Sequence, residues 1–213
     1  MLQALLAISW MWFYGVAFLT QFPVFAKDVL GGNEAVASLL LAVFSIGIAL
    51  GSVACEWLAR GRVEIGLVPL GAIGMTAFGV DLYFATRGLP QGTALQGVAA
   101  FVRDPAHWRA MLDLFLLSAS AGIYSVPLYT LIQHHTPVTH RARVVAANNI
   151  INAVYMVVCS GYCAGLLVAG VSVPVVLLSV ALLNALAGTW LVWRQPLYGQ
   201  RFVAWLRRAA PAA

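Results

Sequence analysis

The sequence predicts an all-α, polytopic membrane protein in which six transmembrane helices form one bundle, and three observations lead to this prediction. Hydrophobic residues make up 62% of the 213 residues and charged residues only 9%, whereas about a quarter of residues are charged in a typical soluble domain. Six long apolar segments alternate with short polar breaks, and each is close to the roughly 20 residues that a helix needs to cross a bilayer. The segments lack the alternation of membrane β-strands, so helices are the way in which their backbone can be satisfied in hydrocarbon.

The predicted spans follow one another with little sequence left over. They cover residues 5–26, 35–57, 65–86, 106–133, 144–170 and 173–193. Residues 1–195 therefore form one transmembrane domain, which leaves little room for a soluble catalytic domain. Residues 196–213 are expected to form a basic, amphipathic cytoplasmic tail, because Phe202, Trp205 and Leu206 share one helical face among arginines, as in an interfacial helix.

Each span is bounded by polar or helix-breaking residues. The successive breaks are Lys27 to Asn33, Arg60 to Arg62, Arg87 to Arg103, His134 to Arg143 and Gly170 to Pro174. At the start of the fourth span, Asp104 followed by Pro105 predicts an N-cap and a first helical position.

Basic residues predict the orientation of the bundle. With an even number of spans both termini lie on one side, and the two sides differ in their Lys and Arg content. The side of the termini carries Arg60, Arg62, Arg141, Arg143, Arg194, Arg201, Arg207 and Arg208, and the opposite side carries Lys27, Arg87, Arg103 and Arg109. The excess of basic residues predicts that both termini are cytoplasmic. It also accounts for the net charge of +5 without the concentrated basic face of a nucleic-acid-binding protein.

Polar residues inside the spans are the candidate functional residues, because each is costly in lipid unless it faces protein or water. Asn148, Asn152 and Tyr155 share one face of the fifth span, with Asn149 beside them. Two interpretations stay open for this stripe. It lines a substrate path, or it forms the interhelical hydrogen bonds that hold the bundle together.

Two spans combine polar residues with a proline. Gln21 lies near Pro23 in the first span, and Tyr124 and Gln133 accompany Pro127 in the fourth. Both helices are therefore expected to break near one end, as helices do beside substrate sites in transporters. These three polar residues join the candidate substrate path.

Asp81 and Asp113 are the carboxylates deepest in apolar sequence, and both are expected near the outer side. One interpretation makes either of them a proton carrier for coupled transport. The other is structural: they lie at the membrane interface or pair with Arg87 or Arg109.

Two glycine pairs have the four-residue spacing that allows helix backbones to approach closely. They are Gly47 with Gly51, and Gly161 with Gly165. Because such pairs are common in membrane helices, each pair marks either a tight contact or ordinary composition.

Catalytic and metal-binding patterns are missing from the sequence. The three cysteines lie in apolar runs without a zinc-type spacing, and no nucleophile motif accompanies the histidines. We therefore expect no enzyme activity, no cofactor and no metal.

The loop between the second and third spans contains a small residue, an acid four positions later and a Gly-Arg cluster. These residues are Ser52, Glu56, Arg60, Gly61 and Arg62. The run resembles the loop signature of the major facilitator superfamily, which recurs in each half of those transporters. It departs from that signature in having serine where glycine is usual and Trp57 where a basic residue is common.

A narrower resemblance covers nearly the whole chain. The segments that carry it are FYGVAFLTQFPVFAKDVLGG (13–32), LLLAVFSIGIALGS (39–52), VEIGLVPLGAIGM (63–75), VPLYTLIQHH (126–135) and RARVVAANNIINAVYMV (141–157). They are similar to the second half of the lysophospholipid-transporter branch of that superfamily. The resemblance implies a C-terminal six-helix half made of two three-helix repeats. It also implies transport of lysophospholipid across a bacterial inner membrane, by alternating access, in support of phospholipid metabolism.

Facilitator transporters hold their substrate between two six-helix halves, so the resemblance implies a missing half. That half is part of the same polypeptide, a second copy of this chain or another chain. Some relatives are fused to a phospholipid acyltransferase and an acyl-acyl-carrier-protein ligase, so such domains join membrane lipids among the expected partners. Two alternatives remain: a non-transporting membrane platform that anchors phospholipid-acylating enzymes, and a facilitator for a different small solute.

Overall fold

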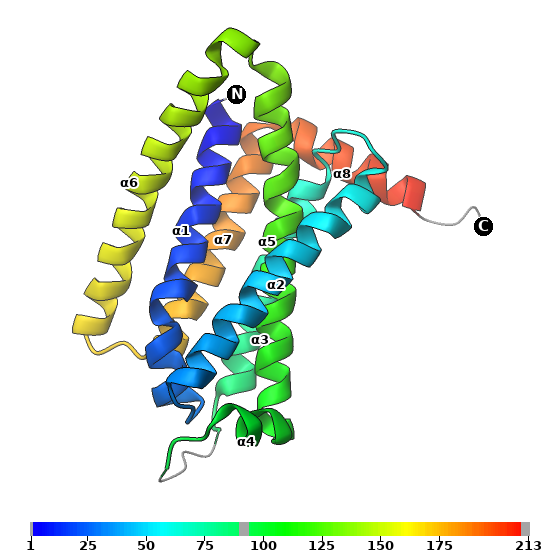
Figure 1. The fold of residues 1–213 in the computed structure, drawn as a ribbon. Helices are drawn as coiled ribbons and strands as arrows, with labels where there is room; N and C mark the ends of the chain where they lie inside the picture. The colour runs from blue at the N-terminus through cyan, green and yellow to red at the C-terminus, as the bar shows by residue number, and fades with distance from the viewer. Residues whose placement is uncertain (1, 90–93, 210–213) are drawn as a thin grey trace.

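The structure is a computed structural model, and it describes residues 2–89 and 94–209. Within these ranges the regular structure is helical, apart from one isolated β-bridge between Gly32 and Gln96. Six of the described helices are long and apolar enough to cross a membrane. The predicted fold class, an all-α polytopic membrane protein, is confirmed (Figure 1).

The six long helices coincide with the six predicted spans, with ends that differ by a few residues. They are α1 (Leu2–Val24), α2 (Glu34–Ala59), α3 (Leu67–Thr86), α5 (Trp108–His135), α6 (Arg141–Val168) and α7 (Val173–Arg194). The shorter elements are the π-helix η1 (Phe25–Val29), the helix α4 (Val98–Arg103), the 3₁₀ turns η2 (Pro105–His107) and η3 (Val138–His140), and the terminal helix α8 (Pro196–Ala209).

Local sequence sets the ends of these helices. The Asn33 side chain caps α2 by accepting hydrogen bonds from the amides of Ala35 (3.1 Å) and Val36 (3.3 Å). Asp104 accepts a bond from the amide of Ala106 (3.0 Å), so the N-cap predicted there is confirmed. Both caps satisfy amides that have no partner within their own helix.

The prolines of α1 and α5 have different effects. Soon after Pro23 the hydrogen-bonding pattern changes from α1 to the π-helix η1, but the chain stays helical from Leu2 to Val29, so the break predicted there is wrong. The break predicted at Pro127 is also wrong, because α5 is a single helix through that position. Pro127 cannot donate to the carbonyl of Ile123, but the Cys55 thiol of α2 approaches that oxygen at 3.8 Å. A neighbouring helix thus supplies the missing donor, as happens in membrane bundles.

The long helices form two layers (Figure 1). The front layer contains α6, α1 and α5, with α2 crossing α5 diagonally, and the back layer contains α7 and α3. Helices α2 and α3 pack along α5, while α6 and α7 pack along α1. If α1 is exchanged with α5, α2 with α6 and α3 with α7, each of these helix pairs becomes another pair of the same set. This symmetry is the arrangement expected of two three-helix repeats.

One predicted glycine contact is present and the other is not. A Cβ atom at Gly51 would overlap the carbonyl group of Ala119, and one at Gly122 would lie 2.5 Å from the carbonyl oxygen of Ile48. The backbones of α2 and α5 therefore touch. Around Gly161 and Gly165 a Cβ atom would meet nothing within 4 Å, because α6 packs mainly on α1 through another side.

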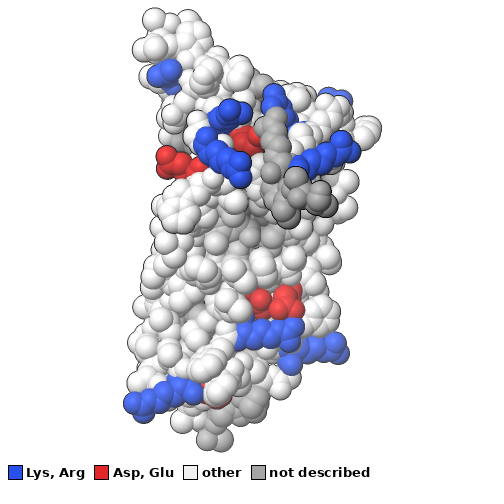
Figure 2. All heavy atoms as spheres, turned by 90° about the vertical axis from the view of Figure 1, so that its right-hand side faces the viewer, with Lys and Arg blue, Asp and Glu red and all other residues white. Residues whose placement is uncertain are grey.

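The charged side chains gather at the two ends of the bundle. Figure 2 shows, on one face, groups of Lys, Arg, Asp and Glu at each end and a band without these residues between them. The N-terminus and α8 lie at the same end (Figure 1), as six spans require. Large apolar side chains are exposed between the ends, for example Ile150 (67%) and Val157 (72%), a pattern that fits contact with lipid and would be anomalous in water.

Candidate functional site at the contact of α1 and α6

A polar cluster lies where α6 packs against α1 in the front layer. The amide of Asn152 is at its centre and is buried (6% exposed). Its nitrogen donates to Ser9 Oγ (2.7 Å) and to the carbonyl oxygen of Asn148 (3.1 Å). Its oxygen accepts from Asn148 Nδ2 and from the indole nitrogen of Trp12, both at 3.1 Å. Two asparagines of α6 are thereby bonded to two residues of α1.

The cluster extends to α5 and to the surface of the bundle. The Trp12 indole nitrogen also lies 3.0 Å from Tyr129 Oη, so one N–H group faces acceptors on both α5 and α6. The Trp12 side chain is 37% exposed. The cluster thus reaches the surface of the front layer through an aromatic side chain with a polar edge.

One hydrogen-bond acceptor in the cluster has no partner among the described residues. Asn148 is 5% exposed, and its Oδ1 atom has no hydrogen-bond partner among the described residues. Buried polar atoms are nearly always paired, and an unpaired one calls for a specific explanation. A donor from a ligand or from another chain would satisfy this oxygen.

The cluster lies deep within the span formed by α6. Asn152 is eleven residues past the start of α6 at Arg141, which is roughly 16 Å along a helix that rises about 1.5 Å per residue. Helix α6 has 28 residues, so Asn152 lies well inside the membrane and toward its middle. Substrate sites of secondary transporters lie near that level.

The other residues of the predicted stripe are less buried. Tyr155 is half-buried and packs against the core beside the cluster. Asn149 is exposed and points away from the α1 contact. The structure therefore brings Asn148 and Asn152 together and leaves Asn149 outside the cluster.

The three polar residues beside prolines do not gather at one site. Tyr124 is buried and its hydroxyl donates to the carbonyl oxygen of Ala7 (3.1 Å), which ties α5 to α1. Gln133 is exposed near the end of α5. Gln21 is buried on α1, twelve residues beyond Ser9, and its Oε1 atom has no partner among the described residues. Gln21 thus forms a separate unsatisfied position toward the other end of the bundle.

Sequence reasoning missed Ser9, Trp12 and Tyr129. A serine in an apolar run is a weak signal, and the Trp and Tyr side chains resemble ordinary interfacial residues. The period of α6 revealed the two asparagines, but no pattern in the sequence pairs α6 with α1. These three residues become recognisable only once that helix contact is known.

In a second polar cluster, in the back layer, the central amide has a hydrogen-bond partner for both its oxygen and its nitrogen. Asn184 of α7 is buried (1% exposed). Its oxygen accepts from Trp10 Nε1 (2.9 Å), and its nitrogen donates to the carbonyl oxygen of Ala72 and to Thr76 Oγ1, each at 2.9 Å. The group joins α7 to α1 and α3, and its role is structural.

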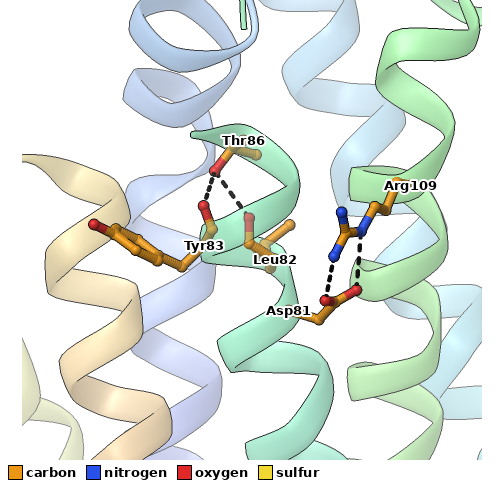
Figure 3. A network of polar contacts seen from close by, with 5 residues as sticks. All are labelled: Asp81, Leu82, Tyr83, Thr86 and Arg109. Atoms are coloured by element: carbon orange, nitrogen blue, oxygen red, sulfur yellow. Dashed lines mark hydrogen bonds and ion pairs between the residues drawn. The ribbon is translucent and has the colours of Figure 1, made fainter. Parts of the chain in front are cut away.

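The predicted carboxylates lie together near the end opposite the termini, at the contact of α3 and α5. The Arg109 guanidinium donates from Nε and Nη2 to both carboxylate oxygens of Asp81, as Figure 3 shows. The side chain of Arg109 is 57% exposed and that of Asp81 is 41% exposed, so the pair is at the bundle surface. This contact is the structural alternative for Asp81. Asp113 is buried beside the pair (3% exposed), and its Oδ2 atom has no hydrogen-bond partner among described residues.

The facilitator-like loop ends α2 with an unusual backbone. Arg60 has a left-handed conformation (φ 53°), followed by Gly61 at φ 69°. Ser52 donates to the carbonyl oxygen of Ile48 (2.8 Å). The spacing of Glu56 and Arg60 suggests a helical ion pair, but these two described residues form none, because the left-handed turn takes Arg60 off the helix face. Arg62 follows the turn and is exposed.

Comparison of the chain with models of protein families, with curated proteins and with solved structures finds no match. The structure and the chemistry of the residues therefore carry the functional argument. Over the described residues, they define a polytopic membrane protein whose front layer contains a buried polar cluster with an unpaired acceptor on Asn148, besides the unpaired atoms of Gln21 and Asp113.

Proposed function

We propose that this chain is one six-helix half of a facilitator-type transporter, and that it moves lysophospholipid or another amphiphile across the inner membrane. The observation that carries the proposal is the unsatisfied acceptor of Asn148 in a buried polar cluster at membrane depth. A cluster that served only to join helices would be expected to satisfy its own groups, as the Asn184 cluster does.

The arrangement of the helices supports a second half in front of the cluster. Helix α6 has one main neighbour, α1, and most of its remaining surface is exposed. Alternating access works by rocking one half against the other around a site at their interface. In the proposed mechanism the partner covers the front layer, and the cluster faces the gap between the halves.

The surroundings of the cluster suit an amphiphile. Asn148 offers a free acceptor to a polar head, while the half-buried Tyr155 and the exposed Trp12 (37%) beside it offer aromatic surface to a tail. A single acyl chain can lie against these side chains while the head donates to Asn148 Oδ1. Lysophospholipid has this division between one tail and a polar head.

The rival proposal is a membrane platform that anchors phospholipid-acylating enzymes and moves no lipid. It requires a bundle with accessible surfaces, which the exposed basic residues at the end of the termini provide. The two proposals differ in whether substitutions at the cluster change lipid movement.

The experiment reconstitutes the protein in vesicles and follows a fluorescent lysophosphatidylethanolamine by its protection from a membrane-impermeant quencher. The first step determines the native polypeptide with an antibody against residues 196–213. A band near the 22.8 kDa of this chain directs the assay to the chain and its cross-linked partner, and a larger band directs it to the complete polypeptide. We expect time-dependent lysolipid movement that falls at least tenfold in Asn152→Leu.

Asn149→Leu is the matched control, because it makes the same change on the same helix outside the cluster. We expect it to retain lipid movement at an equal protein level. Equal activity of Asn152→Leu and the control would refute the site. Absence of lysolipid movement in the assembled protein, with retained binding of an acylating enzyme, would replace the transporter by the platform.

A further inference from the structure

A groove on the back layer has features that the transport site does not explain. It has a volume of about 620 Å³ and lies between α3, α7 and α8, within the roughly 300–1,000 Å³ of typical small-molecule sites. On α3 it runs from Pro69 to Ala77, almost entirely within the half of that helix nearest the chain termini. The groove therefore faces the membrane leaflet next to α8.

The wall of the groove offers mainly hydrocarbon, and the polar groups of its asparagine and threonines are already hydrogen-bonded. Four side chains in the wall contain oxygen or nitrogen: Asn184, Thr76, Thr189 and Trp193, whose indole side chain is exposed (73%). The Asn184 amide makes three hydrogen bonds within the bundle. The hydroxyls of Thr76 and Thr189 donate to the carbonyl oxygens of Ala72 (3.0 Å) and Ala185 (2.7 Å). An occupant of this groove is therefore held by apolar contact, as an acyl chain is.

Helix α8 closes one end of the groove and places it at the membrane surface. Gly199 and Phe202 of α8 line the groove. The helix is docked firmly, because Trp205 Nε1 donates to the carbonyl oxygen of Leu58 (3.2 Å) and a Cβ at Gly66 would lie 2.7 Å from the Arg201 backbone. Aromatic residues at this level are typical of the boundary between lipid tails and headgroups.

The closed end is positively charged. Arg194 follows Trp193, which lines the groove, and Arg201 precedes Phe202, which also lines it. Both arginines are exposed. The sequence contains no Asp or Glu after Asp113, so α7 and α8 themselves carry no acid, and Glu64, just before α3, lies beside Trp205 of α8. Basic side chains at this depth attract anionic lipid headgroups.

We propose that this groove binds one acyl chain of an anionic diacyl phospholipid, with the phosphate of its headgroup at Arg194 and Arg201. The lipid is a bound component of the protein, distinct from any transported molecule. The groove lies in the back layer, across the bundle from the Asn152 cluster, so the inference does not depend on the proposed transport.

The test measures lipid retention by native mass spectrometry of the full chain purified in detergent. Added phosphatidylglycerol is titrated against added phosphatidylcholine. We expect one phosphatidylglycerol per chain to survive conditions that strip phosphatidylcholine. Two variants, Ala185→Phe and Ala77→Phe, fill the groove from opposite walls, and each should weaken retention at least tenfold.

Ala49→Phe is the matched control, because Ala49 is an exposed alanine on α2 away from the groove. It should retain phosphatidylglycerol as the unaltered protein does. Ala77 is itself exposed, so Ala77→Phe tests the groove even where Ala185→Phe fails to fold. Unchanged retention in the folded groove variants, or no retained lipid in the unaltered protein, overturns the proposal.

A second arm tests the headgroup contact. Arg201→Gln should reduce the preference for phosphatidylglycerol over phosphatidylcholine and keep binding of the acyl chain. Arg143→Gln removes an exposed charge from the same end of the bundle on α6 and should leave the preference unchanged. Equal effects of the two substitutions would refute the assignment of the phosphate to Arg201.

Discussion

Replacing Gly51 by alanine tests how closely α2 and α5 pack. The new Cβ atom would overlap the carbonyl group of Ala119, a backbone group that cannot rotate away. Overpacking of this kind costs roughly 1–3 kcal/mol, and a backbone clash belongs at the upper limit, about 3 kcal/mol. The gain in helix propensity from glycine to alanine offsets about 1 kcal/mol of it. The expected net loss is about 2 kcal/mol, or roughly 30-fold in the folded-to-unfolded ratio.

Gly165→Ala provides the matched control, since a Cβ atom there meets nothing within 4 Å. It should leave stability unchanged or raise it by up to about 1 kcal/mol. The assay is unfolding of each variant in mixed detergent micelles, followed by steric trapping or by loss of the monodisperse peak. The two substitutions are chemically identical, so opposite signs isolate the helix contact. Equal stabilities of the two variants would refute the close approach of α2 and α5.

Three further substitutions test the remaining contacts with the same unfolding assay. Asn184→Leu leaves the Trp10 indole without its acceptor, so we expect the free energy of unfolding to fall by about 2 kcal/mol. The three hydrogen bonds of Asn184 are lost, and such bonds average about 0.6 and reach about 1.7 kcal/mol each in membranes. A neutral effect would contradict the structural role. Arg109→Gln should cost less than about 1 kcal/mol, because its pair with Asp81 is exposed, and a larger loss would show that the pair is buried by a partner. Trp205→Phe should cost about 1 kcal/mol and increase proteolysis of α8; unchanged protection of α8 would contradict its docking through Leu58.

Composition and hydropathy were sufficient to predict the six spans, because length and polarity decide whether a helix can cross a bilayer. Local chemistry also predicted the cap at Asp104. The continuity of α5 through Pro127 could not be predicted, since it depends on the Cys55 thiol of another helix. The glycine pairs show the same limit: Gly51 touches α5, whereas Gly165 faces open space. Spacing within one helix does not reveal which face a neighbour covers.

Like the fold, the candidate site could be predicted only in part from the sequence. The period of α6 predicted that Asn148 and Asn152 share a face, and the structure places both in one cluster. Ser9 and Trp12 complete it from α1, and their contribution depends on the pairing of α1 with α6, which has no signature in the sequence. Tyr124 was predicted beside the same path but bonds to the backbone of α1, because a residue near a proline can face the core as well as a site.

The contrast between the two asparagine clusters supports the proposal that the stripe lines a substrate path. Both clusters are buried and both join helices, so burial alone does not distinguish a site from a structural contact. Asn184 satisfies its amide within the back layer, and the groove beside it is correspondingly suited to hydrocarbon. Asn148 retains a free acceptor in the front layer, next to the exposed Trp12 and to a helix that has one main neighbour. A free buried acceptor is costly in a membrane, so we propose that a donor reaches Asn148 from outside the described bundle. A second half and a polar lipid head both supply such a donor, and the Asn152→Leu and Asn149→Leu pair measures whether lipid movement depends on it.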